Sequence, residues 1–133
     1  MSTATAYAAY RGQYVADSVA TASPAKLVTM LYDRLALDLT RAAAAIEDGD
    51  REASSAALLH AQDIVSALQA SLRAEAWSGG PGLASLYDYL LRELIAANVQ
   101  GSAEKVVACQ ELVAPLRDAW HEAARSLLAQ GAA

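Results

Sequence analysis

The sequence predicts an all-α fold, an antiparallel up-down four-helix bundle preceded by an N-terminal arm or short capping helix. Hydrophobic residues make up 55% of the 133 residues, and much of this share is alanine, a strong helix former. The chain has three prolines and no phenylalanine. Apolar residues recur at helical spacing in four segments that short turns separate. We therefore expect an arm over residues 1–22 and a single bundle domain over residues 23–131.

The first helix is expected over residues 24–47. Ser23 suits the N-cap, because its hydroxyl can accept an unpaired backbone N–H, and Pro24 suits the first helical position. Gly49 is expected to end this helix in the left-handed conformation, and Asp50 to cap the next one. The apolar ridge of the first helix consists of Leu27, Leu31, Leu35, Leu39, Ala42 and Ile46.

The second and third helices are expected over residues 51–75 and 83–98. The glycine-rich stretch over residues 78–82 separates them and is expected to form a turn that interrupts the helices. The third helix is apolar nearly all round. Such a helix is either central in the fold, or buried on one side and adhesive on the other.

The fourth helix is expected over residues 103–129, with Ser102 as its N-cap. Pro115 lies inside it and removes one backbone hydrogen bond, so we expect a kink or a split near Glu111. The apolar stripe of this helix, read as core, consists of Val106, Val113, Leu116, Trp120, Ala123 and Leu127.

The arm carries three tyrosines, Tyr7, Tyr10 and Tyr14, spaced three and four residues apart. This spacing places the rings on one face of a short helix, which would be marginal by itself. Large amphipathic rings on one face favour docking onto an apolar surface. The alternative is a frayed tail that happens to contain tyrosines.

Charge and cysteine content argue against several classes of protein. The formal net charge is −5 and the arginines are dispersed, whereas a nucleic-acid-binding surface needs clustered basic residues. Cys109 is the single cysteine, so neither an intramolecular disulfide nor a cysteine-based metal site is expected. The sequence shows no signal peptide and no apolar run that approaches the roughly 20 residues of a membrane span. We expect a cytoplasmic protein without membrane insertion.

Catalysis finds no support in the sequence. The Glu-x-x-His pairs of a di-iron bundle are missing, because no glutamate has a histidine three residues later. His60 and His121 are the remaining candidates for phosphotransfer, and a structural role explains both better. Cys109 is expected to be a small apolar residue of the buried core. We expect no enzyme activity, no metal and no cofactor.

The remaining feature is surplus apolar surface. A bundle helix needs about three apolar positions in seven, and the first and third helices exceed this share. In an acidic protein such faces suggest a groove for an amphipathic segment of a partner. A self-associating helical adaptor is the alternative. As side-facing groove candidates we name five residues, each of which could equally serve the core: Ile64, Leu68, Leu72, Leu90 and Ile95.

Two motifs resemble those of the FliS family of flagellar export chaperones. The first is Ser23-Pro24 followed by an apolar run that ends in Tyr32-Asp33, and the second joins a glycine-rich turn to Leu-Tyr-Asp-Tyr over residues 86–89. An Arg-Asp-Ala-Trp element over residues 117–120 matches the last helix. Order and spacing of these motifs agree over about residues 7–124.

The resemblance implies a cytoplasmic four-helix bundle that binds the disordered C-terminal segment of flagellin. It also implies that the chaperone prevents premature polymerisation and helps deliver flagellin to an export gate component at the membrane. Tyr10 matches the tyrosine of the family's N-terminal segment, and Tyr7 takes the place of an apolar residue before it. Our hypothesis is that Tyr7 and Tyr10 cap the groove or clamp the client.

Overall fold

A computed structural model describes residues 24–73 and 78–132. Four α-helices account for nearly all of these residues. They are α2 (Pro24–Glu47), α3 (Arg51–Ser71), α4 (Gly80–Gln100) and α5 (Ala103–Ala132). The predicted all-α class with four helices is thus confirmed. Ser23 and the arm over residues 1–22 lie outside the described residues, so the predicted N-cap and the two tyrosine assignments stay predictions.

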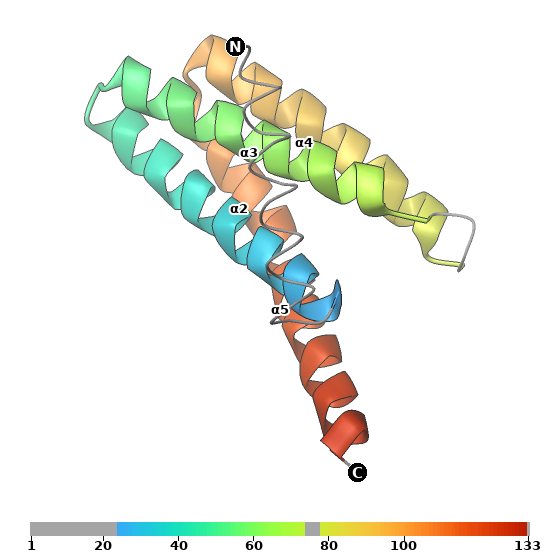
Figure 1. The fold of residues 1–133 in the computed structure, drawn as a ribbon. Coiled ribbons are helices and arrows are strands. Elements are labelled where there is room, and N and C mark those ends of the chain that lie inside the picture. Colours follow the sequence, from blue (N-terminus) through green and yellow to red (C-terminus); the bar gives the residue numbers. More distant parts are fainter. Residues whose placement is uncertain (1–23, 74–77, 133) are drawn as a thin grey trace, which may run out of the picture.

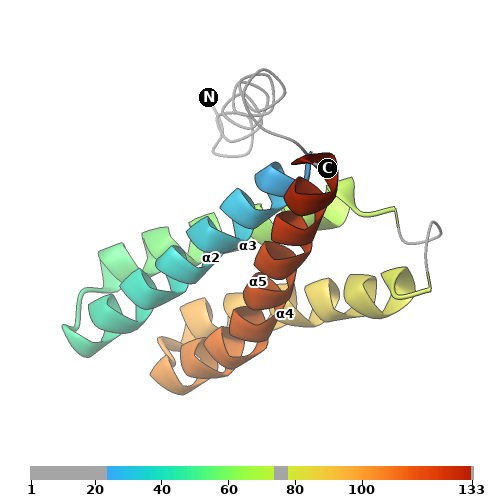
Figure 2. The same cartoon turned by 90° about the horizontal axis from the view of Figure 1, so that it is seen from below.

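The helices pack as a four-membered ring. α2 contacts α3 and α5, and α4 contacts the same two helices. α3 and α4 lie side by side, while α4 and α5 diverge from the turn that joins them (Figures 1 and 2). The distance between the two helices therefore increases from their shared turn toward the beginning of α4 and the end of α5. This divergence creates the candidate site described below.

The two tight turns follow the predicted chemistry. Gly49 has φ of 73° and Gly101 has φ of 62°, a left-handed backbone in which an L side chain is strained. The side chain of Asp50 accepts the backbone N–H of Ala53 at 3.0 Å. The Ser102 hydroxyl accepts the N–H of Lys105 at 3.2 Å. Both predicted N-caps of these turns are confirmed.

Four helix boundaries differ from the prediction. α4 ends at Gln100 rather than at residue 98, and α5 ends at Ala132 rather than at residue 129. α3 ends at Ser71 rather than at residue 75, because Leu72 turns to extended backbone (φ −76°, ψ 128°) and donates its N–H to the Gln69 carbonyl. α4 begins at Gly80 rather than at residue 83, so the last three residues of the expected glycine-rich break belong to the helix. Pro81 lies in the first turn of α4, where its missing N–H would have no intrahelical partner in any case.

Pro115 does not split the last helix, and that alternative of the prediction was wrong. α5 continues through the proline from Ala103 to Ala132. Pro115 and Glu111 both face solvent. Water can therefore satisfy the Glu111 carbonyl that loses its intrahelical donor, which reduces the cost of the proline.

The core runs along the inside of the ring. The stripe expected for α5 holds only as far as Val113. Leu116 and Trp120 are partly buried, Ala123 is exposed, and Leu127 is 55% exposed. Periodicity identified the apolar face of α5 correctly, but beyond Val113 no described side chain of that face is fully buried. The largest fully buried apolar side chains are Tyr32, Leu35, Leu39, Leu58, Ile64, Val65, Leu90, Leu94, Val106 and Val113.

Candidate functional site

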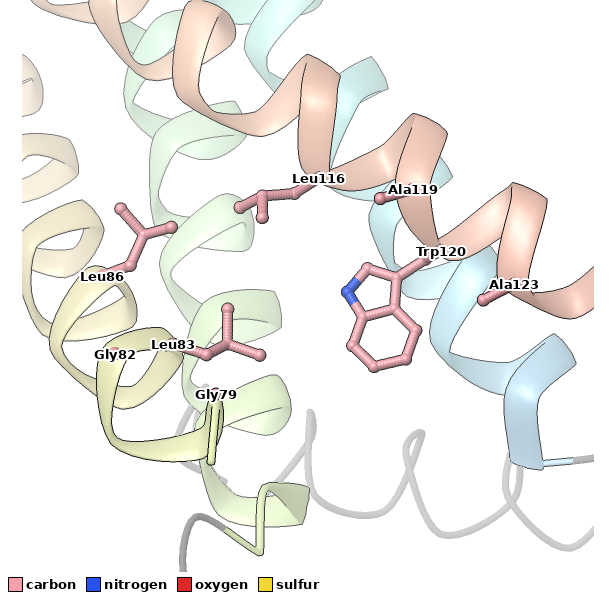
Figure 3. A pocket seen from close by; sticks show the side chains of 8 residues that line it. All are labelled: Gly79, Gly82, Leu83, Leu86, Leu116, Ala119, Trp120 and Ala123. Carbon is pink, nitrogen blue, oxygen red and sulfur yellow. The ribbon is translucent and has the colours of Figure 1, made fainter. Parts of the chain in front are cut away.

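An apolar groove of about 440 Å³ lies between the beginning of α4 and the second half of α5. Leu83 and Leu86 project from α4, and Leu116 and Trp120 project from α5 into the same gap (Figure 3). Four small residues complete the lining and leave room between the larger side chains, namely Gly79, Gly82, Ala119 and Ala123.

The groove stays open because the second half of α5 lies away from α4. Within the described residues, the buried positions of α5 are Val106, Cys109 and Val113, all in its first half. The last turns of α5 run beyond the start of α2 (Figure 1), and Leu128 is 71% exposed. Contiguous uncovered apolar surface of this kind marks an interaction site more often than a defect.

An aromatic cluster lies beside the groove. The hydroxyls of Tyr32 and Tyr87 are 2.7 Å apart and share a hydrogen bond, although the two residues are only 0% and 2% exposed. The Tyr32 and Trp120 rings lie 6.3 Å apart between centroids. Burial raises the pKa of both tyrosines, so their hydroxyls stay protonated. The cluster thus couples α2, α4 and α5.

A charged cluster also links α2 to α5, and it is centred on Asp33, the residue that follows Tyr32 on α2. Asp33 Oδ1 accepts hydrogen bonds from Arg117 Nε and His121 Nε2, each at 2.6 Å. Burial raises the pKa of Asp33, but the hydrogen bonds and charges of His121 and Arg117 outweigh it and hold this pKa below its usual value. We call these three residues the Asp33 clamp. Arg117 and His121 directly flank groove residues of α5.

The candidates named from the sequence fall into three groups. Tyr7 and Tyr10 lie outside the described residues. Ile64, Leu68 and Leu90 are buried members of the core, and Leu72 is half-buried against it. Ile95 is 49% exposed on α4. The structure brings none of the five described candidates into the groove, and the assignment of all seven residues to flagellin binding stays a prediction.

Sequence reasoning missed the residues that line the groove. Leu116 and Trp120 were read as core because they lie on the same stripe as Val113. The observation that could have identified them is the surplus of apolar positions on the third helix, combined with the glycines that precede it. A helical period shows which face is apolar but not where its neighbouring helix diverges.

The described residues include both histidines and the single cysteine, the side chains considered above for catalysis. His60 Nδ1 hydrogen-bonds the buried carboxylate of Asp38 at 2.5 Å, and His121 bonds Asp33, so each half-buried histidine is paired with a carboxylate. Burial and the charge of Glu93 raise the pKa of the buried Cys109 thiol to about 11. Within residues 24–73 and 78–132, no three His, Cys, Asp or Glu side chains are grouped to hold a metal ion. Over the same ranges, no helix combines the length and hydropathy that crossing a membrane requires.

Fold and groove together define the class of the protein, a four-helix bundle with an open apolar groove. Comparison with known proteins gives its family. The model of the family described as "Flagellar protein FliS" matches residues 6–127, and the chain belongs to that family.

Curated relatives agree with this assignment. A protein of Salmonella typhimurium named flagellar secretion chaperone FliS is 35% identical over 126 residues, which span 92% of each chain. Its namesake in Bacillus subtilis is 33% identical over 113 residues, which cover 85% of this chain and 84% of the relative. The Escherichia coli protein of the same name is 32% identical over 116 residues, which cover 86% and 85%.

Proposed function

We propose that this protein is a flagellar secretion chaperone that binds the C-terminal segment of flagellin in the cytoplasm. It would prevent premature polymerisation and help deliver flagellin to the export gate, acting by binding rather than by catalysis. The observation that carries the proposal is the open apolar groove between α4 and α5 in a chain of this family. The names of the relatives support the chaperone role.

The physical requirements of such a client fit the groove. A disordered segment loses several kcal/mol of conformational freedom on ordering, so a large apolar contact must offset that cost. The four large apolar side chains of the groove, together with the exposed leucines at the end of α5, provide such a contact. An amphipathic helix of the client would place its apolar face between Leu86 and Trp120.

Copurification with flagellin tests the proposal. Full-length flagellin should copurify with the chain, and flagellin without its C-terminal segment should not. Leu86→Glu places a charge in the groove and should abolish the complex. Leu59→Glu, on α3 away from the groove and 48% exposed, is the matched control and should leave the complex intact. Survival of the complex in the Leu86→Glu variant, or binding that ignores the flagellin C-terminus, would contradict the proposal.

The residues named from the sequence can be tested in the same assay. If Tyr7 and Tyr10 cap the groove or clamp the client, deletion of residues 1–14 should change the affinity for a flagellin C-terminal peptide in calorimetry. Ile95→Glu, and Leu72→Glu in a variant checked for folding, report whether a second apolar contact exists outside the groove. Unchanged affinity in each case removes that residue from the site.

Delivery to the export gate needs a separate readout. Secretion of flagellin into the medium should fall when the complex cannot form, so the Leu86→Glu variant should be defective and the Leu59→Glu control should secrete normally. A partner of the gate can be identified by retention of the preformed complex on immobilised gate components. Retention without flagellin would show that the chaperone is recognised by itself.

A further inference from the structure

We propose that Asp33 is a positioning residue: through Arg117 and His121 it fixes the α5 wall of the groove, and thereby sets how tightly the groove holds a helical segment. The inference rests on the proposed function only for the identity of that segment. Its structural part concerns the free chain and can be tested without any client.

The geometry of the Asp33 clamp is specific. One carboxylate oxygen of α2, Asp33 Oδ1, accepts from two side chains of α5 that lie 84 and 88 residues later in the sequence. Arg117 and His121 are four residues apart, so they lie one above the other on a single face of α5. Two donors on successive turns resist both rotation and sliding of the helix, which a single hydrogen bond would not.

The Asp33 clamp contacts the part of α5 that lies beyond the buried core. Beyond Val113, none of the α5 side chains described is buried, so close packing alone does not fix the second half of the helix. The groove wall consists of Leu116, Ala119, Trp120 and Ala123, which alternate along the chain with the two donors. Tyr32 contacts Trp120 from the same segment of α2. The orientation of the wall therefore depends on the pair Tyr32-Asp33.

Without the Asp33 charge, the side chains of Arg117 and His121 could form ion pairs with other carboxylates. Asp118 and Glu122 lie beside Arg117, His121 and Arg125 on α5 itself. Pairs formed within α5 would satisfy the charges but would not tie the helix to α2. Asp33 is 42% exposed, and ion pairs at such sites are screened by solvent and contribute little to global stability. Loss of the clamp should thus alter the groove without unfolding the bundle.

The test uses Asp33→Asn, which keeps the shape of the side chain and removes its charge. Trp77→Phe leaves Trp120 as the single tryptophan in every variant, because the chain has two. Quenching of Trp120 fluorescence by acrylamide reports the wall in the free chain, and calorimetry with a flagellin C-terminal peptide reports the groove. Asp48→Asn, in the turn between α2 and α3, is the matched control.

We expect Asp33→Asn to keep its helical circular dichroism, to raise the quenching of Trp120, and to weaken peptide binding by roughly 2- to 5-fold, the effect of losing one solvent-screened ion pair. Arg117→Gln with His121→Gln should reproduce both effects. Adding Asp33→Asn to that pair should change nothing further, because the three residues act as one unit. The Asp48→Asn control should match the native chain.

Two results would overturn the inference: unchanged quenching and affinity in Asp33→Asn, or additive effects of the α2 and α5 substitutions. Altered quenching with unchanged affinity would also overturn it, because the wall would then move without consequence for the groove. If the unsubstituted chain binds no flagellin peptide, the proposed function fails. The quenching of Trp120 still decides whether the clamp holds α5, so the two failures are distinguishable.

Discussion

The buried hydrogen bond between Tyr32 and Tyr87 should show strong coupling between two substitutions. The hydroxyls are 2.7 Å apart, and both side chains are essentially inaccessible to water. Tyr87→Phe removes one hydroxyl and leaves the other without its partner. A buried polar group in that state costs about 1–3 kcal/mol of unfolding free energy. Tyr32→Phe should cost about as much, because it leaves the buried Tyr87 hydroxyl without its partner.

The double variant should behave differently from the sum of the single ones. With both hydroxyls gone, no buried hydroxyl is left unpaired, and replacing both partners by apolar groups can be nearly neutral. We expect each single variant to lose about 2 kcal/mol and the double variant to lose no more than about 1 kcal/mol. Non-additivity of about 3 kcal/mol would lie at the upper end of measured couplings.

Urea unfolding at 25 °C measures these differences. With a slope of about 2 kcal/mol per molar urea, each single variant should shift the midpoint by about 1 M. The double variant should shift it by about 0.5 M rather than 2 M. Tyr89→Phe, at a tyrosine that is 43% exposed, is the control and should stay within about 0.5 kcal/mol of the native chain. Additive losses in the double variant would refute the reasoning.

Three further predictions concern other features of the chain. Pro115→Ala should raise the unfolding free energy by about 1–3 kcal/mol, because it restores a backbone donor inside an unbroken helix, and a thermal melt with a lower midpoint would contradict this. Cys109, whose thiol pKa is raised to about 11, should be about one-thousandth thiolate at pH 8, so a disulfide reagent should label it fast only after unfolding. The pKa of Asp33 is lowered in the folded chain, so its stabilising effect should be present above its unfolded pKa of about 4. That effect should be lost as the pH falls through the lower folded value, and the difference in stability from Asp33→Asn should shrink accordingly in urea titrations.

Helix content followed from the sequence because its causes are local. α2 and the start of α3 were predicted to the residue, since Gly49 and Asp50 act within one turn. Two of the four misplaced boundaries, at Ser71 and Gly80, flank the glycine-rich connection between α3 and α4. There the chain can continue or leave the helix at little local cost, so packing between distant helices decides the boundary.

The existence of an apolar groove was predicted, but its position was not. Surplus apolar residues indicated a groove, but the named candidates Ile64, Leu68 and Leu90 proved to be core. Tyr32 shows the opposite case: it was noted as part of a motif, and the structure places it at the centre of the core. Which apolar face remains uncovered depends on the angle between two helices, and no local pattern encodes that angle.

The sequence by itself determined the helical class, the caps of the two tight turns, the absence of a recognisable catalytic motif and, through its motifs, the resemblance to one family. Each of these depends on residues that are close together in the chain or on residue identity alone. Only the tertiary structure decided that α5 diverges from α4 and that Trp120 lines a groove instead of the core. It also brought Asp33 to Arg117 and His121. These contacts join residues more than 80 positions apart, and burial of the core as a whole, rather than any local preference, brings them together.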